Sequence, residues 1–161
     1  MNHANPTVMR AKARAAVDFL KNQLVTTGNI EPLVALFFHD HIEQVQFEDP
    51  SILEHFDLRT MRGLDYLRNV ARLKHPQAAM IALDVRMGRF ESEEVDVAPD
   101  TTAIFFMLDS PLLTIQVIVP YARSRNGITL SREQFTESTS DKEDIPCPLF
   151  RLFSNAPALA C

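Results

Sequence analysis

The sequence predicts an α+β fold, with helices in the first half of the chain and an antiparallel sheet in the second half. In residues 7–27, apolar residues recur mostly three or four positions apart, as on a helix. After Pro76 they form runs that are mostly rich in Val, Ile, Leu and Phe, separated by short turn sequences. Short connections between successive strands are typical of antiparallel sheets. We therefore expect three N-terminal helices packed on a curved antiparallel sheet.

Three helices are expected before Pro76, each opened by a capping residue or a glycine. Their predicted ranges are residues 7–27, 29–38 and 63–74. The second helix has Asn29 as its cap and Pro32 in its first turn, where the missing N–H costs nothing. Its residues 33–38 are apolar on all sides. We therefore expect this helix to be buried between layers of the fold.

The expected strands are residues 41–49, 79–91, 101–109, 112–122 and 128–135. Asn126-Gly127 lies between the last two strands and is the strongest hairpin signal in the chain. Gly88, inside a long strand, indicates a bulge or a bend. Residues 136–161 change from polar to apolar. We expect one domain over residues 1–135 and a C-terminal extension over 136–161, which forms either a flap, an ordinary packed terminus or an interface segment.

The composition is that of one globular domain with no nucleic acid or membrane as its partner. The chain has 161 residues and a net charge of −5, and it shows no basic stripe. No run approaches the roughly 20 apolar residues that span a bilayer. The N-terminal residues lack the apolar segment of a signal peptide, so we expect a cytoplasmic protein. Cys147 and Cys161 fit neither a metal site nor a disulfide framework.

Asp49 is the first candidate for a site residue. It follows Phe47 at the end of an expected strand and precedes Pro50, which disfavours helical backbone at the residue before it. A carboxylate at the edge of an apolar pocket can serve as a proton-transfer base, and burial raises its pKa. The alternative is that Asp49 caps a turn, as Asp before Pro often does.

His39 and His41 lie two apart where the expected strand 41–49 begins, and residues two apart on a strand share a face. Two such histidines can bind a metal, but a third ligand is not evident. We therefore expect no metal and no other cofactor. His41 shares its face with Asp49, so it is a candidate for relaying protons in the same cavity. The alternative is a solvated histidine at a helix-to-strand junction.

Thr114 and Gln116 are polar positions in an otherwise apolar strand. Gln116 is a candidate donor to a substrate carbonyl oxygen if its face of the sheet lines the cavity. The alternative is that this face is solvated. Tyr121 and Tyr66 are further possible donors, whereas the Asp84-x-Arg86 pair is expected to lie on the surface.

The order of elements resembles the cone-shaped, cystatin-like α+β fold of the nuclear transport factor 2-like superfamily. Within it, the similarity is to SnoaL-like polyketide cyclases and to ketosteroid isomerase. Ketosteroid isomerases carry a Gly-Asp-Ile-Glu helix start, a Glu-Asp-Pro segment and a Gly-Arg-Glu helix opening. In the same order this chain has Gly28-Asn29-Ile30-Glu31, Glu48-Asp49-Pro50 and Arg62-Gly63-Leu64-Asp65.

The resemblance places Asp49 at the position of the isomerase's catalytic base. The oxyanion partners do not carry over, because this chain has Lys21 or a neighbouring apolar residue in place of a tyrosine, and Val117 or Val119 in place of an aspartate. The resemblance therefore implies proton transfer other than steroid isomerisation.

The implied function is that of a cofactor-free isomerase, cyclase or dehydratase of secondary metabolism. Its substrate would be an apolar oxygenated molecule such as a polyketide or a terpenoid. The alternative is a non-catalytic module on the same fold that binds a ligand or forms a dimer. We also expect a homodimer, because strands 103–108 and 113–119 each have two largely apolar faces, of which one needs a partner.

Overall fold

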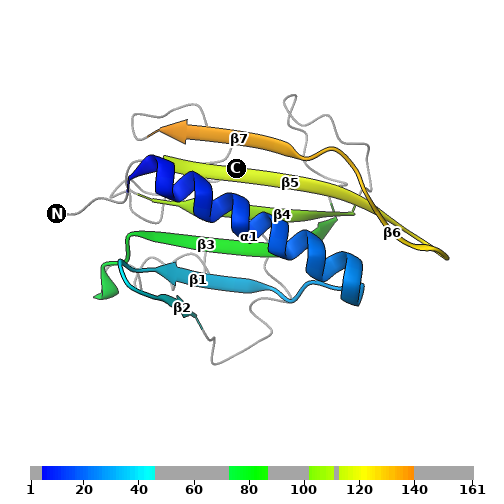
Figure 1. Ribbon diagram of the computed structural model, residues 1–161, viewed down its shortest axis with the longest axis horizontal. Helices are drawn as coiled ribbons and strands as arrows, with labels where there is room; N and C mark the ends of the chain where they lie inside the picture. Colours follow the sequence, from blue (N-terminus) through cyan, green and yellow to red (C-terminus); the bar gives the residue numbers. More distant parts are fainter. Residues whose placement is uncertain (1–4, 46–72, 87–101, 111–112, 140–161) are drawn as a thin grey trace.

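The computed structural model describes residues 5–45, 73–86, 102–110 and 113–139. Within these ranges one long helix, α1 (Pro6–Thr27), lies across one face of a seven-stranded antiparallel sheet (Figure 1). The strands are β1 (Leu33–Phe37), β2 (Ile42–Gln44), β3 (Ala78–Arg86), β4 (Thr102–Asp109), β5 (Leu113–Ser124), β6 (Gly127–Leu130) and β7 (Gln134–Thr139). The α+β class is confirmed. The sheet is neither closed nor strongly curled.

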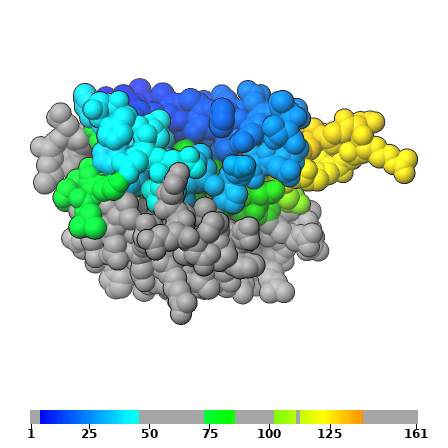
Figure 2. All heavy atoms as spheres, turned by 90° about the horizontal axis from the view of Figure 1, so that it is seen from below, coloured from blue at the N-terminus to red at the C-terminus, as the bar shows by residue number. Residues whose placement is uncertain are grey.

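The sheet has the strand order β2-β1-β3-β4-β5-β6, and β7 also pairs with β5. β5 is 12 residues long, so its first half can pair with β7 and its last four residues with β6. Arg125 and Asn126 form the loop between Ser124 and Gly127. Gly127 has a φ of +116°, a backbone conformation that glycine adopts readily. The predicted hairpin is confirmed, and it extends beyond the other described strands (Figure 2, yellow).

The helix predicted over residues 29–38 is wrong, because this segment contains strand β1. β1 lies between β2 and β3, and its residues 34–37 are all buried. A strand buried on both faces shows no polar alternation, so its short apolar run has the same appearance as a buried helix. Its length of five residues, which is short for a helix, was the signal that favoured a strand.

α1 begins and ends within one residue of the prediction. The Asn5 side chain accepts a hydrogen bond of 2.8 Å from the Thr7 N–H, so Asn5 caps the helix. Pro6 occupies the first helical position, where no N–H is needed. At the other end, Gly28 has a φ of +80° and donates its N–H to the Leu24 oxygen at 2.9 Å.

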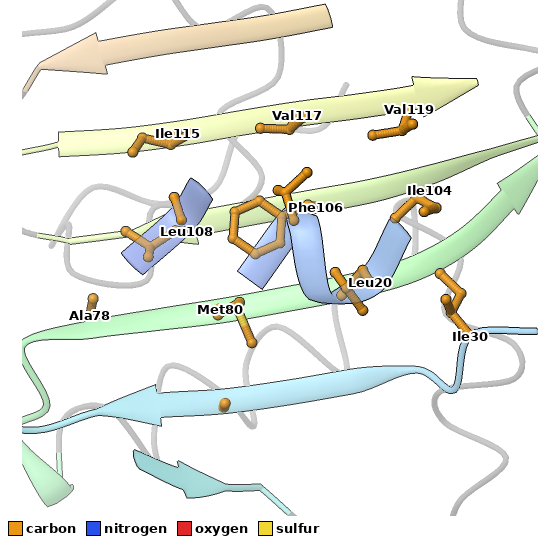
Figure 3. Packing of buried hydrophobic residues seen from close by; sticks show 14 of the residues in the cluster. Leu20, Ile30, Ala78, Met80, Ile104, Phe106, Leu108, Ile115, Val117 and Val119 are labelled. Atoms are coloured by element: carbon orange, nitrogen blue, oxygen red, sulfur yellow. The ribbon is translucent and has the colours of Figure 1, made fainter. Parts of the chain in front are cut away.

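The main core lies between α1 and the sheet (Figure 3). Along α1, the buried side chains recur at helical spacing and face the sheet: Met9, Ala13, Val17, Leu20 and Leu24. In Figure 3, Leu20 lies in the same cluster as Phe106 of β4 and Met80 of β3. Burying a side chain of this size stabilises the fold by about 1.5–3 kcal/mol. The match between the two apolar surfaces therefore holds α1 on the sheet.

The opposite face of the sheet, here called the second face, is also buried. Its apolar residues alternate with those that face α1, and they include Val34, Leu36, Ile81, Leu83, Phe105, Met107 and Ile118. Among the described residues, α1 covers the other face of the sheet and not the second face. The sheet is nevertheless an apolar layer buried on both sides, which explains why its central strands carry few polar residues.

The remaining predicted elements correspond only in part to described residues. The strand predicted at 41–49 contains β2, and the strand at 128–135 is divided into β6 and β7 by residues 131–133. β7 continues to Thr139, past the predicted end of the first domain at residue 135. Most of the predicted third helix, together with Gly88, Asp49 and residues 140–161, lies outside the described residues.

Candidate functional site

Polar side chains gather on the second face where β4, β5 and β7 lie side by side. The register places Asp109 of β4 opposite Thr114 of β5, and Thr114 opposite Ser138 of β7. Directly opposed residues of antiparallel strands point to the same face. Gln116 lies one row along, opposite Met107. We call Asp109, Thr114, Gln116 and Ser138 the polar cluster.

A tight turn between β4 and β5 fixes this register. The Ser110 N–H and the Ser110 hydroxyl both donate to the Leu113 oxygen, at 2.9 and 2.7 Å. The Leu113 N–H donates back to the Ser110 Oγ at 3.1 Å. These bonds hold the first residue of β5 at a set distance from the end of β4. Asp109 is therefore brought opposite Thr114 by local hydrogen bonding.

The polar cluster contains a carboxylate that is almost completely removed from solvent. Asp109 is 4% exposed, although carboxylates are rarely buried without a partner. Thr114 donates its hydroxyl to the Asp109 Oδ1 at 2.5 Å. Since Thr114 is anchored in the middle of the sheet, this bond fixes the position of the carboxylate.

Ser138 is 7% exposed, and its Oγ is buried without a hydrogen-bond partner among the described residues. Leaving such a group unpaired costs about 1–3 kcal/mol. Buried hydroxyls in native proteins usually have a partner, and an exception calls for an explanation such as a bound molecule. Ser138 therefore provides an open hydrogen-bonding position beside the Thr114–Asp109 pair.

Gln116 is half-buried on the second face, next in line along β5 from Thr114. Its amide has two N–H donors and one acceptor oxygen. It can therefore hydrogen-bond to a polar group that lies beside Ser138. The role predicted for Gln116 stays a prediction, and the structure places this side chain on the face away from α1.

His41 lies in a different part of the molecule. It is exposed, its ring stacks on Phe38 at 4.6 Å, and its Nδ1 lies 2.7 Å from the Asp40 Oδ1. The bond to His41 lowers the pKa of Asp40. Three strands separate β2, which His41 precedes, from β5, or about 19 Å at 4.8 Å per strand. The structure thus does not bring His41 and Gln116 together, and Asp49 lies outside the described residues.

A second group of ionisable side chains lies on the α1 face. Tyr121 donates its hydroxyl to both oxygens of Asp84, at 2.7 and 2.8 Å. Arg123 bonds to the Tyr121 oxygen at 3.3 Å and to the Gly28 oxygen at 2.5 Å. Burial, followed by the bond to Asp84, raises the pKa of Tyr121, so the phenol stays protonated at neutral pH. This network ties β3 and β5 to the end of α1, which is a structural role.

Sequence reasoning did not single out Asp109 or Ser138. Asp109 is the one charged residue of β4 and precedes Ser110-Pro111, a combination that is also typical of turns. Ser138 lies in a polar stretch, where a serine carries no distinguishing signal. The two residues become a pair only through the pairing of both strands with β5, which local sequence does not determine.

In the described ranges, no three His, Cys, Asp or Glu side chains lie close enough together to hold a metal ion. No helix among these residues is long and apolar enough to cross a membrane. No protein-family model, curated protein or solved structure matches the chain.

Proposed function

We propose that this protein is a cofactor-free enzyme that transfers a proton on an apolar, oxygenated small molecule such as a polyketide or a terpenoid. The substrate would lie against the second face, with its oxygen at the polar cluster. The observation that carries the proposal is the buried Oγ of Ser138, which has no hydrogen-bond partner among the described residues and lies on the same apolar face as the Thr114–Asp109 pair, on the strand next to Thr114. This atom is closed to solvent, so substrate entry requires the fold to open there.

In this mechanism Asp109 is the base. Thr114 holds its carboxylate in place, and the carboxylate accepts a proton from the carbon next to a substrate carbonyl. The carbonyl oxygen gains negative charge as the proton leaves, and the Ser138 hydroxyl and the Gln116 amide donate hydrogen bonds to it. Returning the proton to a different carbon completes an isomerisation. Phe105, buried on the same face, helps to exclude water, which strengthens these interactions.

The SnoaL-like relationship expected from the sequence belongs to the same proposal. The α+β class is compatible with it, but the sheet is neither closed nor strongly curled, unlike the expected cone, and many unrelated functions share a helix packed on an antiparallel sheet. The resemblance assigns the base to Asp49, whereas the described geometry supports Asp109. Replacing each carboxylate separately distinguishes the two assignments.

The test follows proton transfer directly, without the natural substrate. Cyclic β,γ-unsaturated ketones and β-diketones are incubated with the protein in D2O, and NMR measures deuterium entering the carbon next to the carbonyl. We expect catalysed exchange in the wild type and a loss of roughly 10²- to 10⁴-fold in Asp109→Asn. Asp18→Asn, at an exposed position of α1, is the matched control and should keep full activity.

Full exchange in Asp109→Asn together with loss in Asp49→Asn would contradict the assignment of the base and favour the one implied by the resemblance. Ketones that bind to the wild type without any exchange would contradict catalysis. That result would favour the alternative, a ligand-binding module whose polar cluster only recognises an oxygen. Thermal unfolding of every variant shows whether a loss of activity reflects a loss of the fold.

A further inference from the structure

The turn between β5 and β6 places an asparagine directly before a glycine at an exposed tip. Arg125 and Asn126 form this turn, and the two strands pair from Ser124 and Gly127 onward. β4 accompanies β5 only as far as Tyr121, so beyond that residue the hairpin has two strands among the described residues. The tip extends beyond the other described strands (Figure 2, yellow). Asn126 is therefore exposed to solvent.

The side-chain amide of Asn126 is free to rotate. Among the described residues it makes no hydrogen bond, whereas the Asn126 backbone N–H donates to the Ser124 Oγ at 3.2 Å. The space beside Gly127 is also open, because no atom lies within 4 Å of the place where a side chain would begin. The amide carbon of Asn126 can therefore approach the Gly127 nitrogen without steric obstruction.

We propose that Asn126 is a site of spontaneous deamidation, at which the chain modifies itself. The Gly127 backbone nitrogen attacks the side-chain carbonyl carbon of Asn126 and closes a succinimide ring. The bond from that carbon to the amide nitrogen breaks, and this nitrogen leaves as ammonia with the proton that the Gly127 nitrogen has lost. Water then opens the ring at either carbonyl, which gives aspartate or isoaspartate at position 126. Because the attack is intramolecular, water is the only co-reactant.

The other asparagines of the described ranges are protected from this attack. Asn5 precedes a proline, whose nitrogen has no proton to lose. Asn22 lies inside α1, where the next backbone N–H is bonded within the helix. Asn29 precedes a buried isoleucine, whose branched side chain obstructs the approach. Of the four glycines in the chain, only Gly127 follows an asparagine.

The fold sets the rate of this reaction, because Ser124 and Gly127 pair across the turn and attack requires the tip to open. A two-stranded hairpin is marginally stable, and exposed elements of this kind open locally at a low cost in free energy. We therefore expect Asn126 to react more slowly than in an unfolded peptide of the same sequence, yet faster than the other described asparagines. The proposal depends neither on the polar cluster nor on catalysis.

Deamidation changes the hairpin in two ways. Either product adds a negative charge next to Arg125. Isoaspartate also carries the main chain through the former side chain, which inserts one more carbon before Gly127. That carbon shifts Gly127 relative to Ser124, whose Oγ contacts both neighbouring residues of the turn. Ile128 and Leu130, which pack against the core, follow directly. Isoaspartate should therefore loosen β6, whereas aspartate should not.

The experiment incubates the full-length protein at mildly alkaline pH and follows it by mass spectrometry. Trypsin cuts after Arg125 and Arg132 and so releases residues 126–132, which contain no other asparagine. We expect this peptide to gain about 1 Da, as both aspartate and isoaspartate, faster than the peptides that contain Asn22 or Asn29. Asn126→Gln keeps an amide on a longer side chain and should slow the reaction roughly tenfold or more, because the longer chain closes a ring less readily.

Hydrogen exchange then compares the purified isoaspartate form with Asn126→Asp, which carries the same charge on an unaltered backbone. Exchange at β6 amides should become faster in the isoaspartate form only, and equal exchange in both would contradict the effect on the hairpin. A peptide 126–132 that keeps its mass after a synthetic peptide of the same sequence has reacted would overturn the proposal. Aspartate without any isoaspartate would overturn it as well, because direct hydrolysis gives that product.

Discussion

The Ser138 hydroxyl destabilises the ligand-free protein, because its Oγ has lost water and gained no partner among the described residues. On the neighbouring strand, the hydroxyl of Thr114 does have a partner, because it donates a hydrogen bond to Asp109. Two hydroxyl side chains directly opposite each other thus have different energetic roles. Under the proposed function, the cost at Ser138 is offset when a substrate oxygen accepts a hydrogen bond from its hydroxyl.

We predict that Ser138→Ala stabilises the free protein by about 1 kcal/mol, because the substitution removes a buried hydroxyl that has no partner among the described residues. Urea unfolding measures this change. Ser124→Ala is the matched control, since the Ser124 Oγ accepts from the Asn126 N–H at 3.2 Å and lies 3.3 Å from the Gly127 oxygen. That control should be neutral or slightly destabilising. Destabilisation by Ser138→Ala would contradict the absence of a partner for its Oγ.

At the scale of the element, α1 separates neighbouring residues into buried and exposed environments. Leu20 is 2% exposed and packs in the core below the helix. Phe19, the preceding residue, is 62% exposed on the outer surface. The larger apolar side chain thus faces water and the smaller one faces the sheet. Which of them stabilises the protein depends on the helix phase rather than on hydrophobicity.

Leu20→Ala should therefore lower the free energy of unfolding by about 2–5 kcal/mol, through lost burial and the cavity it leaves. Phe19→Ala should change it by less than about 0.5 kcal/mol, the range of ordinary surface substitutions. Urea unfolding of the two variants under identical conditions provides the comparison. Equal losses in the two variants would show that α1 is rotated relative to the described packing.

Strands β3, β4 and β5 were predictable from the sequence, whereas β1 and the division of residues 128–135 between β6 and β7 were not. β3, β4 and β5 appear as apolar runs between turn residues, and their observed positions agree with the predictions within a few residues at the described ends. The hairpin at Asn126-Gly127 was predictable because its turn chemistry is local. The apolar run of β1 predicts a helix, because burial on both faces removes the polar alternation that identifies a strand.

The polar cluster was predictable only in part. Gln116 and Thr114 stand out as polar positions in an apolar strand, and both lie in the cluster. Asp109 and Ser138 join them through strand pairing over long sequence separations, which periodicity does not encode. Nor could the sequence show which face Gln116 occupies, because both faces of β5 are largely apolar.

At the scale of the whole molecule, ion pairs link the first element to the last described strand. Arg10 bonds to Glu137 of β7, and Arg14 and Lys21 bond to Glu133 just before β7. The bond from Arg10 lowers the pKa of Glu137. Burial acts to raise the pKa of Glu133, but the bonds from Lys21 and Arg14 outweigh it, and the net shift is downward. Both carboxylates thus favour the charged form in the folded protein.

A pKa lowered by folding contributes stability above the unfolded value of about 4.5, and this stability is lost as the pH falls through the folded value. We predict that the wild type loses stability on acidification below about pH 4.5, and that Glu133→Gln with Glu137→Gln flattens this dependence. At neutral pH the double variant should lose about 1 kcal/mol or less per pair, because the arginines are nearly half exposed.

Urea unfolding at a series of pH values measures both effects. The control is Glu31→Gln, an exposed glutamate without an ion pair in the described ranges, which should leave the pH dependence unchanged. An unaltered acid slope in the double variant would show that these ion pairs do not contribute to the stability of the fold.

The strand order also bears on how the chain assembles during synthesis. β3, β4 and β5 pair as successive neighbours, whereas β1 must find β3 across residues 38–77. Loop-closure entropy makes the local pairs form earlier and the distant pair later. α1 precedes all the described strands in the sequence, yet much of the surface that buries its apolar face belongs to β4 and β5. A chain that has been translated only as far as β4 therefore lacks part of the surface that covers this face, and its apolar side chains stay exposed until β5 is added.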